Sequence, residues 1–157
     1  MSRRKSRILA FQGLYSWEVG KIPLEDVLKF DWNSPLESES KSEEKSEDVL
    51  ADNFESESSE NVVFAKMLVA GTVEHLSEID EIIKKHLKTW DFERVNKVSL
   101  SILRMSVYSL KYQQDLQPSI VIDEAIHLAK DFGPEDSFKF VNAILDNIKK
   151  FLNSPEN

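Results

Sequence analysis

The sequence predicts an all-α protein, a bundle of six to seven helices. Apolar residues recur at spacings of three and four through most of the chain, which places them on one face of a helix. No two alternating apolar segments are joined by the short turn of a hairpin, and glycine occurs only four times in 157 residues. Hydrophobic residues make up 41% of the chain, which is enough for a core in a domain of this length.

Four helices are expected before residue 90. The first covers about 3–19, and Pro23, a favourable first-turn residue, begins a short second helix that reaches about Trp32. Ser77 and Asp80 are typical of a capping pair and divide 61–88 into two helices. We expect these two helices to bury the following apolar residues: Val63, Met67, Ala70, Val73, Ile79, Ile82, Ile83 and Leu87.

Three helices are expected in the C-terminal part. The first covers 97–113, and Pro118 begins the second, over about 119–131. Gly133 fits the position after a helix end, and Pro134 with the acidic residues that follow suits the start of the last helix. The inward stripe of that last helix is expected to consist of Phe138, Val141, Leu145, Ile148 and Leu152.

The acidic residues are concentrated in one segment, 34–60, which holds ten of them and two lysines. Its net charge of −8 equals that of the whole chain, so the remainder, with 18 acidic and 18 basic residues, is neutral. The segment has few apolar residues to offset its ordering entropy, which predicts a disordered insertion. It is expected to be a solvated spacer, or an acidic tail that competes with RNA for the basic N-terminus.

The chain contains fragments of catalytic and metal motifs without the motifs themselves. Residues 121–125 resemble the acidic strand end of an ATPase, but no glycine has the neighbourhood of a phosphate loop. Residues 131–133 spell Asp-Phe-Gly without the other kinase motifs. Glu124 and His127 have helical di-iron spacing but no second pair. We therefore expect no enzymatic activity, no metal and no cofactor.

Neither a membrane segment nor a secretion signal is expected. No apolar run approaches 18 residues, and no apolar region with a small-residue cleavage site follows the basic N-terminus. The chain has no cysteine, which removes disulfides, thiol nucleophiles and cysteine-bound zinc. We expect a cytoplasmic protein.

The N-terminus is the most distinctive charged feature, with Arg3, Arg4, Lys5 and Arg7 and no acidic residue. Cations in the first turn of a helix oppose the helix dipole, at a cost of about 0.3–1 kcal/mol each. Phosphates of a nucleic acid would use these charges, since arginine and lysine bind them well. A solubilising terminus is the alternative that charge alone leaves open.

Several separated blocks resemble the NusB family of bacterial transcription antitermination factors. They comprise RRKSR (3–7) with QGLYSW (12–17), ILR (102–104) with VYSL (107–110), DEAIHLAK (123–130), GPEDS (133–137) and KFVNAILD (139–146). The resemblance covers about 3–32 and 60–152, and implies one all-α domain over 1–157, made of two three-helix halves. The acidic insertion, Asp123 and Ala143 depart from the usual family pattern.

The resemblance implies a function and two sets of contact residues. It implies binding to boxA RNA of nascent ribosomal RNA transcripts together with NusE, a small-subunit ribosomal protein, and read-through by RNA polymerase without catalysis. The RNA-binding residues would be Arg3, Arg4, Lys5, Arg7, Asp136, Lys139 and Phe140. Those facing NusE would be Tyr15, Glu18 and Ser99.

The residues themselves leave several of these roles open. Phe140 is either an exposed ring suited to base stacking or a partly buried ring at the bundle edge. Asp136 is expected to start a helix rather than to bind RNA directly, and Tyr15 fits both a core and an interface. Arg104 lies in a largely apolar helix, which favours a structural ion pair over an RNA contact.

Two other protein classes remain as alternatives. A helical protein-interaction adaptor would bind NusE with only incidental RNA contact. The NusB-like part of ribosomal RNA cytosine methyltransferases is a second possibility, but 157 residues leave no room for a cofactor-binding α/β domain.

Overall fold

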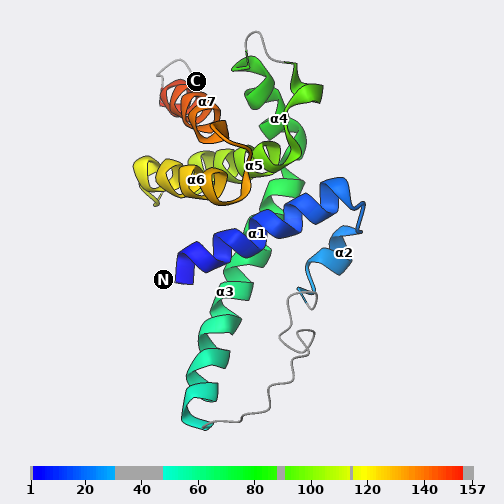
Figure 1. Cartoon of the computed structure of the whole chain (residues 1–157), viewed down its shortest axis with the longest axis vertical. Coiled ribbons are helices and arrows are strands. Elements are labelled where there is room, and N and C mark those ends of the chain that lie inside the picture. The colour runs from blue at the N-terminus through cyan, green and yellow to red at the C-terminus, as the bar shows by residue number, and fades with distance from the viewer. Residues whose placement is uncertain (1, 31–47, 88–90, 114, 154–157) are drawn as a thin grey trace. The chain divides into compact units, whose positions relative to one another are not determined.

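The computed structural model describes the backbone of residues 2–30, 48–87, 91–113 and 115–153, and their side chains except at 2–3 and 48–59. The regular secondary structure within these ranges is entirely helical, which confirms the predicted fold class (Figure 1). The elements are α1 (Ser2–Val19), α2 (Leu24–Val27), α3 (Asp48–Glu74), α4 (Leu76–Lys85), the 3-10 helix η3 (Phe92–Arg94), α5 (Lys97–Tyr112), α6 (Pro118–Phe132) and α7 (Ser137–Leu152).

The chain divides into two compact units, residues 1–67 and 68–157. In the first unit, α1 packs against α2. The Ser6 hydroxyl on α1 donates a hydrogen bond to the Asn61 side-chain oxygen on α3, at 3.3 Å, so this buried polar pair is satisfied. The apolar core of this unit consists of Ala10, Phe11, Leu14, Val27, Phe30 and Ala65.

In the second unit, α5 is the central helix and packs against α4, α6 and α7. Every residue of α5 from Ser99 to Val107 is buried, as expected of a helix with neighbours on several sides. The buried Ser101 hydroxyl is satisfied within the helix, because it donates to the Lys97 carbonyl oxygen at 3.0 Å. Helices α6 and α7 also pack against each other, which encloses the core around α5.

Local sequence signals set several helix ends, of which those at Pro118 and Gly133 were predicted. The Asn96 side-chain oxygen accepts from the backbone N–H groups of Val98 and Ser99, at 2.9 and 3.2 Å, and caps α5. Pro118 is the first residue of α6, and Gly133 follows its last residue. A Cβ atom at Gly133 would lie 2.9 Å from the Ala129 carbonyl oxygen, so the close approach of the backbone requires glycine.

Two predicted boundaries in the first half differ from the structure. Helix α2 ends at Val27 instead of continuing to Trp32, which lies outside the described residues. The buried Phe30 has a left-handed backbone with φ of 54°, which an α-helix cannot continue through. Residues 34–47 of the predicted insertion also lie outside the described residues, and α3 begins at Asp48 instead of 61.

The predicted capping pair at the start of α4 is wrong. The helix begins at Leu76, after His75, whose side chain makes no capping hydrogen bond. Asp80 lies one turn inside the helix, where its carboxylate binds Arg104. The Ser77-x-x-Asp80 spacing fits a cap, but the Asp80 carboxylate instead makes a stronger, charge-assisted interaction with Arg104 on α5.

The predicted inward face of α3 is also wrong in part. Val63 and Met67 are exposed, whereas Ala65, Leu68 and Val69 are buried. Apolar residues in this part of α3 are dense enough to form two overlapping stripes with helical spacing. The elements that pack against the helix select the buried stripe, so periodicity within the helix could not decide it.

Candidate nucleic-acid interface

The predicted basic residues of α1 have different environments. Arg4 and Lys5 are exposed on the first turns of a helix that carries no acidic residue in its first turn. Arg7 is only 5% exposed, and its guanidinium carbon lies 5.9 Å from the centroid of the Phe64 ring on α3. The side chain of Arg3 lies outside the described residues. Arg4 and Lys5 are therefore at the surface, whereas Arg7 packs within its own unit.

A second group of predicted RNA-binding residues lies where α7 begins. Asp136 is the N-cap residue of α7, as expected, but its side chain makes no capping hydrogen bond. Its backbone has φ of 68°, a left-handed conformation that aspartate tolerates better than most residues. The exposed Lys139 ammonium lies 3.8 Å from an Asp136 carboxylate oxygen, so both charges remain at the surface.

Two phenylalanines of α7 lie close to this charged pair in the sequence, and both are half-buried. The half-buried state of Phe140 matches the interpretation of a ring at the bundle edge. Phe138 was expected to be an inward residue, but Lys130 and Lys139 place their ammonium nitrogens 4.8 and 5.9 Å from its ring centroid. Because the apolar spacing of α7 assigned Phe138 to the core, sequence reasoning missed the contact between its ring and Lys130.

The residues expected to face NusE belong to both units. Tyr15 and Glu18 are half-buried on α1, and the Tyr15 ring centroid lies 6.5 Å from that of Phe11. Ser99 belongs to the other unit and is 2% exposed, inside the first turn of α5. Tyr15 and Glu18 are therefore partly accessible to a partner, whereas the Ser99 side chain is buried.

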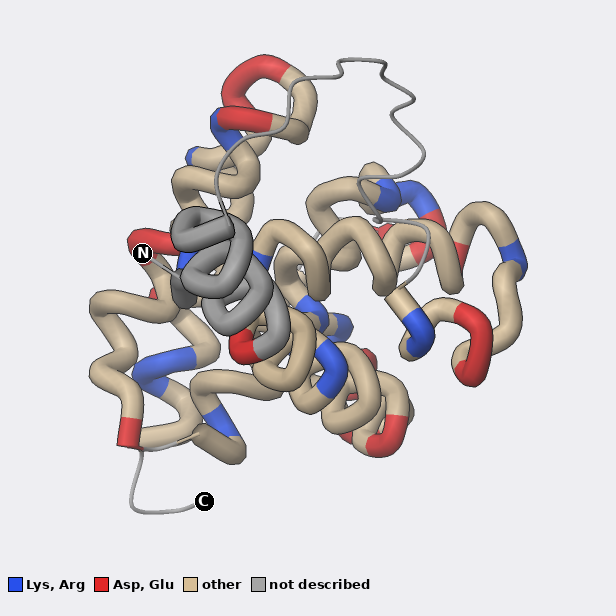
Figure 2. The backbone as a smooth tube through the Cα atoms, turned by 90° about the horizontal axis from the view of Figure 1, so that it is seen from below, with Lys and Arg blue, Asp and Glu red and all other residues tan. Residues whose placement is uncertain are grey.

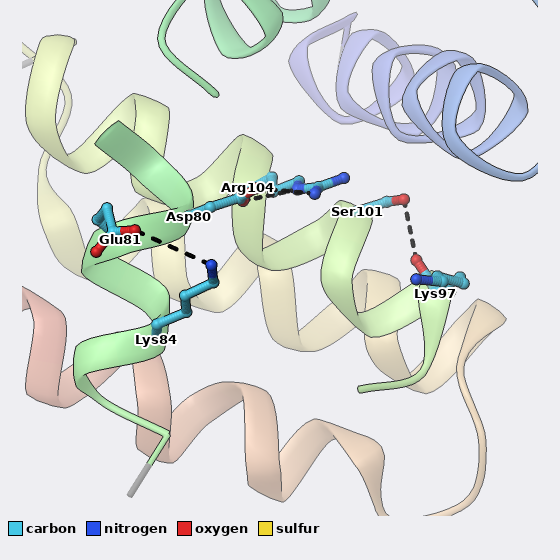
Figure 3. A network of polar contacts seen from close by, with 6 residues as sticks. All are labelled: Asp80, Glu81, Lys84, Lys97, Ser101 and Arg104. Carbon is cyan, nitrogen blue, oxygen red and sulfur yellow. Dashed lines mark hydrogen bonds and ion pairs between the residues drawn. The ribbon is translucent and has the colours of Figure 1, made fainter. Parts of the chain in front are cut away.

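The structural ion pair expected for Arg104 is confirmed (Figure 3). Two guanidinium nitrogens of Arg104 donate to the two carboxylate oxygens of Asp80, each at 2.9 Å. The side chains are 7% and 17% exposed, and the guanidinium also lies 6.0 Å from the Phe92 ring centroid. This bidentate geometry joins α4 to α5 and leaves Arg104 unsuited to contact RNA.

Figure 2 shows basic and acidic residues interspersed along the described backbone. Among the described residues, no group of three or more histidine, cysteine or acidic side chains is arranged to hold a metal ion. A search of the same residues finds no helix with the length and apolar character to cross a membrane.

The family model of the NusB family matches residues 4–150 of this chain. The chain belongs to the NusB family. The transcription antitermination protein NusB of Treponema denticola is 48% identical over 149 residues, which cover 95% of this chain and 96% of that protein. NusB is a family of transcription antitermination factors and not of enzymes.

Two solved NusB structures closely resemble this chain. T. maritima NusB is 31% identical with a TM-score of 0.74, and the match covers 98% of this chain and 94% of that one. A crystal structure of the antitermination factors NusB and NusE in complex with dsRNA gives 28% identity and a TM-score of 0.72, with 96% and 97% covered. The seven described α-helices of this chain therefore follow the NusB fold.

Proposed function

We propose that this protein binds boxA RNA of nascent ribosomal RNA transcripts together with NusE and promotes read-through by RNA polymerase in the cytoplasm. The observation that carries the proposal is the pair of exposed cations, Arg4 and Lys5, on a helix start without a first-turn acid. Their position opposes the dipole of α1, so a bound phosphate would relieve an unfavourable charge arrangement. The related complex of NusB and NusE with dsRNA supports the proposal that this chain binds RNA and NusE.

Because Arg7 is buried, we expect a smaller electrostatic contribution from the N-terminus than four phosphate contacts would give. Each phosphate contact on single-stranded RNA contributes about −0.7 to the slope of log affinity against log salt. With Arg7 buried over the Phe64 ring, Arg4 and Lys5 together contribute a slope of about −1.4. Lys139 can add a further contact, but Asp136 lies 3.8 Å from its ammonium and opposes an RNA phosphate there.

The proposal is tested by binding of a labelled boxA RNA and a scrambled RNA across a salt series, with and without NusE. We expect a boxA preference that NusE strengthens. Changing Arg4 and Lys5 together to Gln should reduce the salt slope by about 1.4. A matched control removes Lys29 and Lys66, two exposed lysines of the same unit, and should leave the slope unchanged.

Equal, weak binding of the two RNAs with NusE still bound would refute the proposal and favour a protein-interaction adaptor. Read-through is measured separately, by transcription in vitro across a terminator placed downstream of boxA. The double variant of Arg4 and Lys5 should lower read-through, and the lysine control should not.

A further inference from the structure

The ring of Phe138 is half-buried, although the helical pattern of α7 assigns it to the core. Lys130 at the end of α6 and Lys139 on α7 both place ammonium groups within 6 Å of the ring centroid. Both lysines are exposed. A long lysine side chain keeps its ammonium group hydrated, so the partly exposed ring lies beside two solvated cations.

The charges around this ring do not favour simple phosphate binding. Residues 130–139 contain two lysines, and also Asp131, Glu135 and Asp136, all three exposed. The local net charge is therefore −1, in contrast with the uniformly basic start of α1. A nucleic acid that contacts this turn would gain from the aromatic ring more than from the charges.

The interactions that now cover the ring are weak enough to be exchanged. An exposed lysine over an aromatic ring contributes less binding free energy than a stacked base does. Removal of the aromatic partner of a stacked base lowers the affinity for the nucleic acid about five- to 150-fold. The exposed ion pair of Lys139 with Asp136 adds little, because solvent screens it. A base can thus take the place of a lysine ammonium over the ring.

We propose that Phe138 is a stacking platform for an unpaired RNA base, flanked by Lys130 and Lys139. This inference rests on the proposed function and divides RNA recognition between two places on the chain. Arg4 and Lys5 supply the salt-dependent attraction, and Phe138 supplies stacking that changes little with salt.

The test compares Phe138→Leu with Phe151→Leu. Phe151 is a matched control, because it is a half-buried phenylalanine of the same helix with the Lys85 ammonium 4.7 Å from its ring centroid. We expect Phe138→Leu to lower the affinity for boxA RNA, with NusE present, by at least about fivefold at an unchanged salt slope. Phe151→Leu should change it by less than about twofold, and Phe138→Tyr should bind as the parent does.

A set of boxA RNAs, each with one abasic position, identifies the stacked base. One position should weaken binding of the parent protein and have no further effect on Phe138→Leu. If Phe138→Leu unfolds, Phe138→Met, whose flexible unbranched side chain adapts to the space left by the ring, takes its place. Circular dichroism checks the fold.

The outcomes separate this inference from the proposed function. If the folded variant binds boxA RNA as the parent does, the stacking role of Phe138 is overturned and the proposed function stands. If the variant loses only NusE binding, the ring belongs to a protein interface and the inference also fails. If the parent protein has no boxA preference even with NusE, both proposals fail together.

Discussion

Removal of the Asp80 carboxylate should destabilise this protein more than a typical surface substitution. The Arg104 side chain is 7% exposed, and both carboxylate oxygens of Asp80 accept from its guanidinium at 2.9 Å. Asp80→Ala would remove the carboxylate charge and the two hydrogen bonds that this buried cation makes with α4. Loss of one partner of a buried pair costs about 3–5 kcal/mol. For a chain of this length, that corresponds to a decrease in Tm of roughly 6–20 °C.

The assay is urea unfolding followed by circular dichroism, with two comparison variants. Glu81→Ala removes an exposed carboxylate of the same helix, which lies 4.0 Å from the Lys84 ammonium, and should cost less than about 1 kcal/mol (Figure 3). The double variant Asp80→Leu with Arg104→Met should be close to the parent in stability, since apolar residues of similar volume often replace a buried pair without loss.

Two results would refute this reasoning. A cost below about 1 kcal/mol for Asp80→Ala would mean that the pair behaves as a solvated surface pair. A loss of boxA affinity in the folded double variant would mean that Arg104 contacts RNA, contrary to its assignment as a structural residue.

Three further predictions concern single positions. Arg7→Met should lower stability but leave the salt slope of RNA binding unchanged, because the Arg7 guanidinium is buried over a ring; a change in slope of about 0.7 would contradict this. Gly71→Ala should lower Tm although alanine favours helix by about 1 kcal/mol, since its Cβ would overlap the Tyr108 ring. The Tyr112 hydroxyl donates a hydrogen bond to Glu78, which lowers the pKa of that carboxyl below 4.5. The hydrogen bond therefore stabilises the folded protein above pH 4.5, and this stabilisation is lost as the pH falls further and the carboxyl is protonated. The free energy of unfolding of Tyr112→Phe should therefore fall less than that of the parent between pH 5 and pH 3, as measured by urea unfolding at each pH.

Features that depend on neighbouring residues in the sequence could be predicted before the structure. Pro118 begins α6 and Gly133 follows its last residue, both as predicted, and Asn96 caps α5 by a signal of the same kind. Each of these signals acts within one helical turn, because it satisfies or removes a backbone group of the adjacent residues. The resemblance to the NusB family rests on the same kind of local blocks, and the family model over 4–150 confirms it.

Sequence alone determined that the protein is helical, that its N-terminus is basic and that it resembles NusB. Only the tertiary structure decided which basic and aromatic residues are at the surface. Arg7 and Lys5 are two positions apart, yet Arg7 is buried over a ring on another helix and Lys5 is exposed. Phe138 has core spacing but lies under Lys130 from α6. The physical reason is the same in both cases: burial is set by residues distant in sequence that the fold brings alongside.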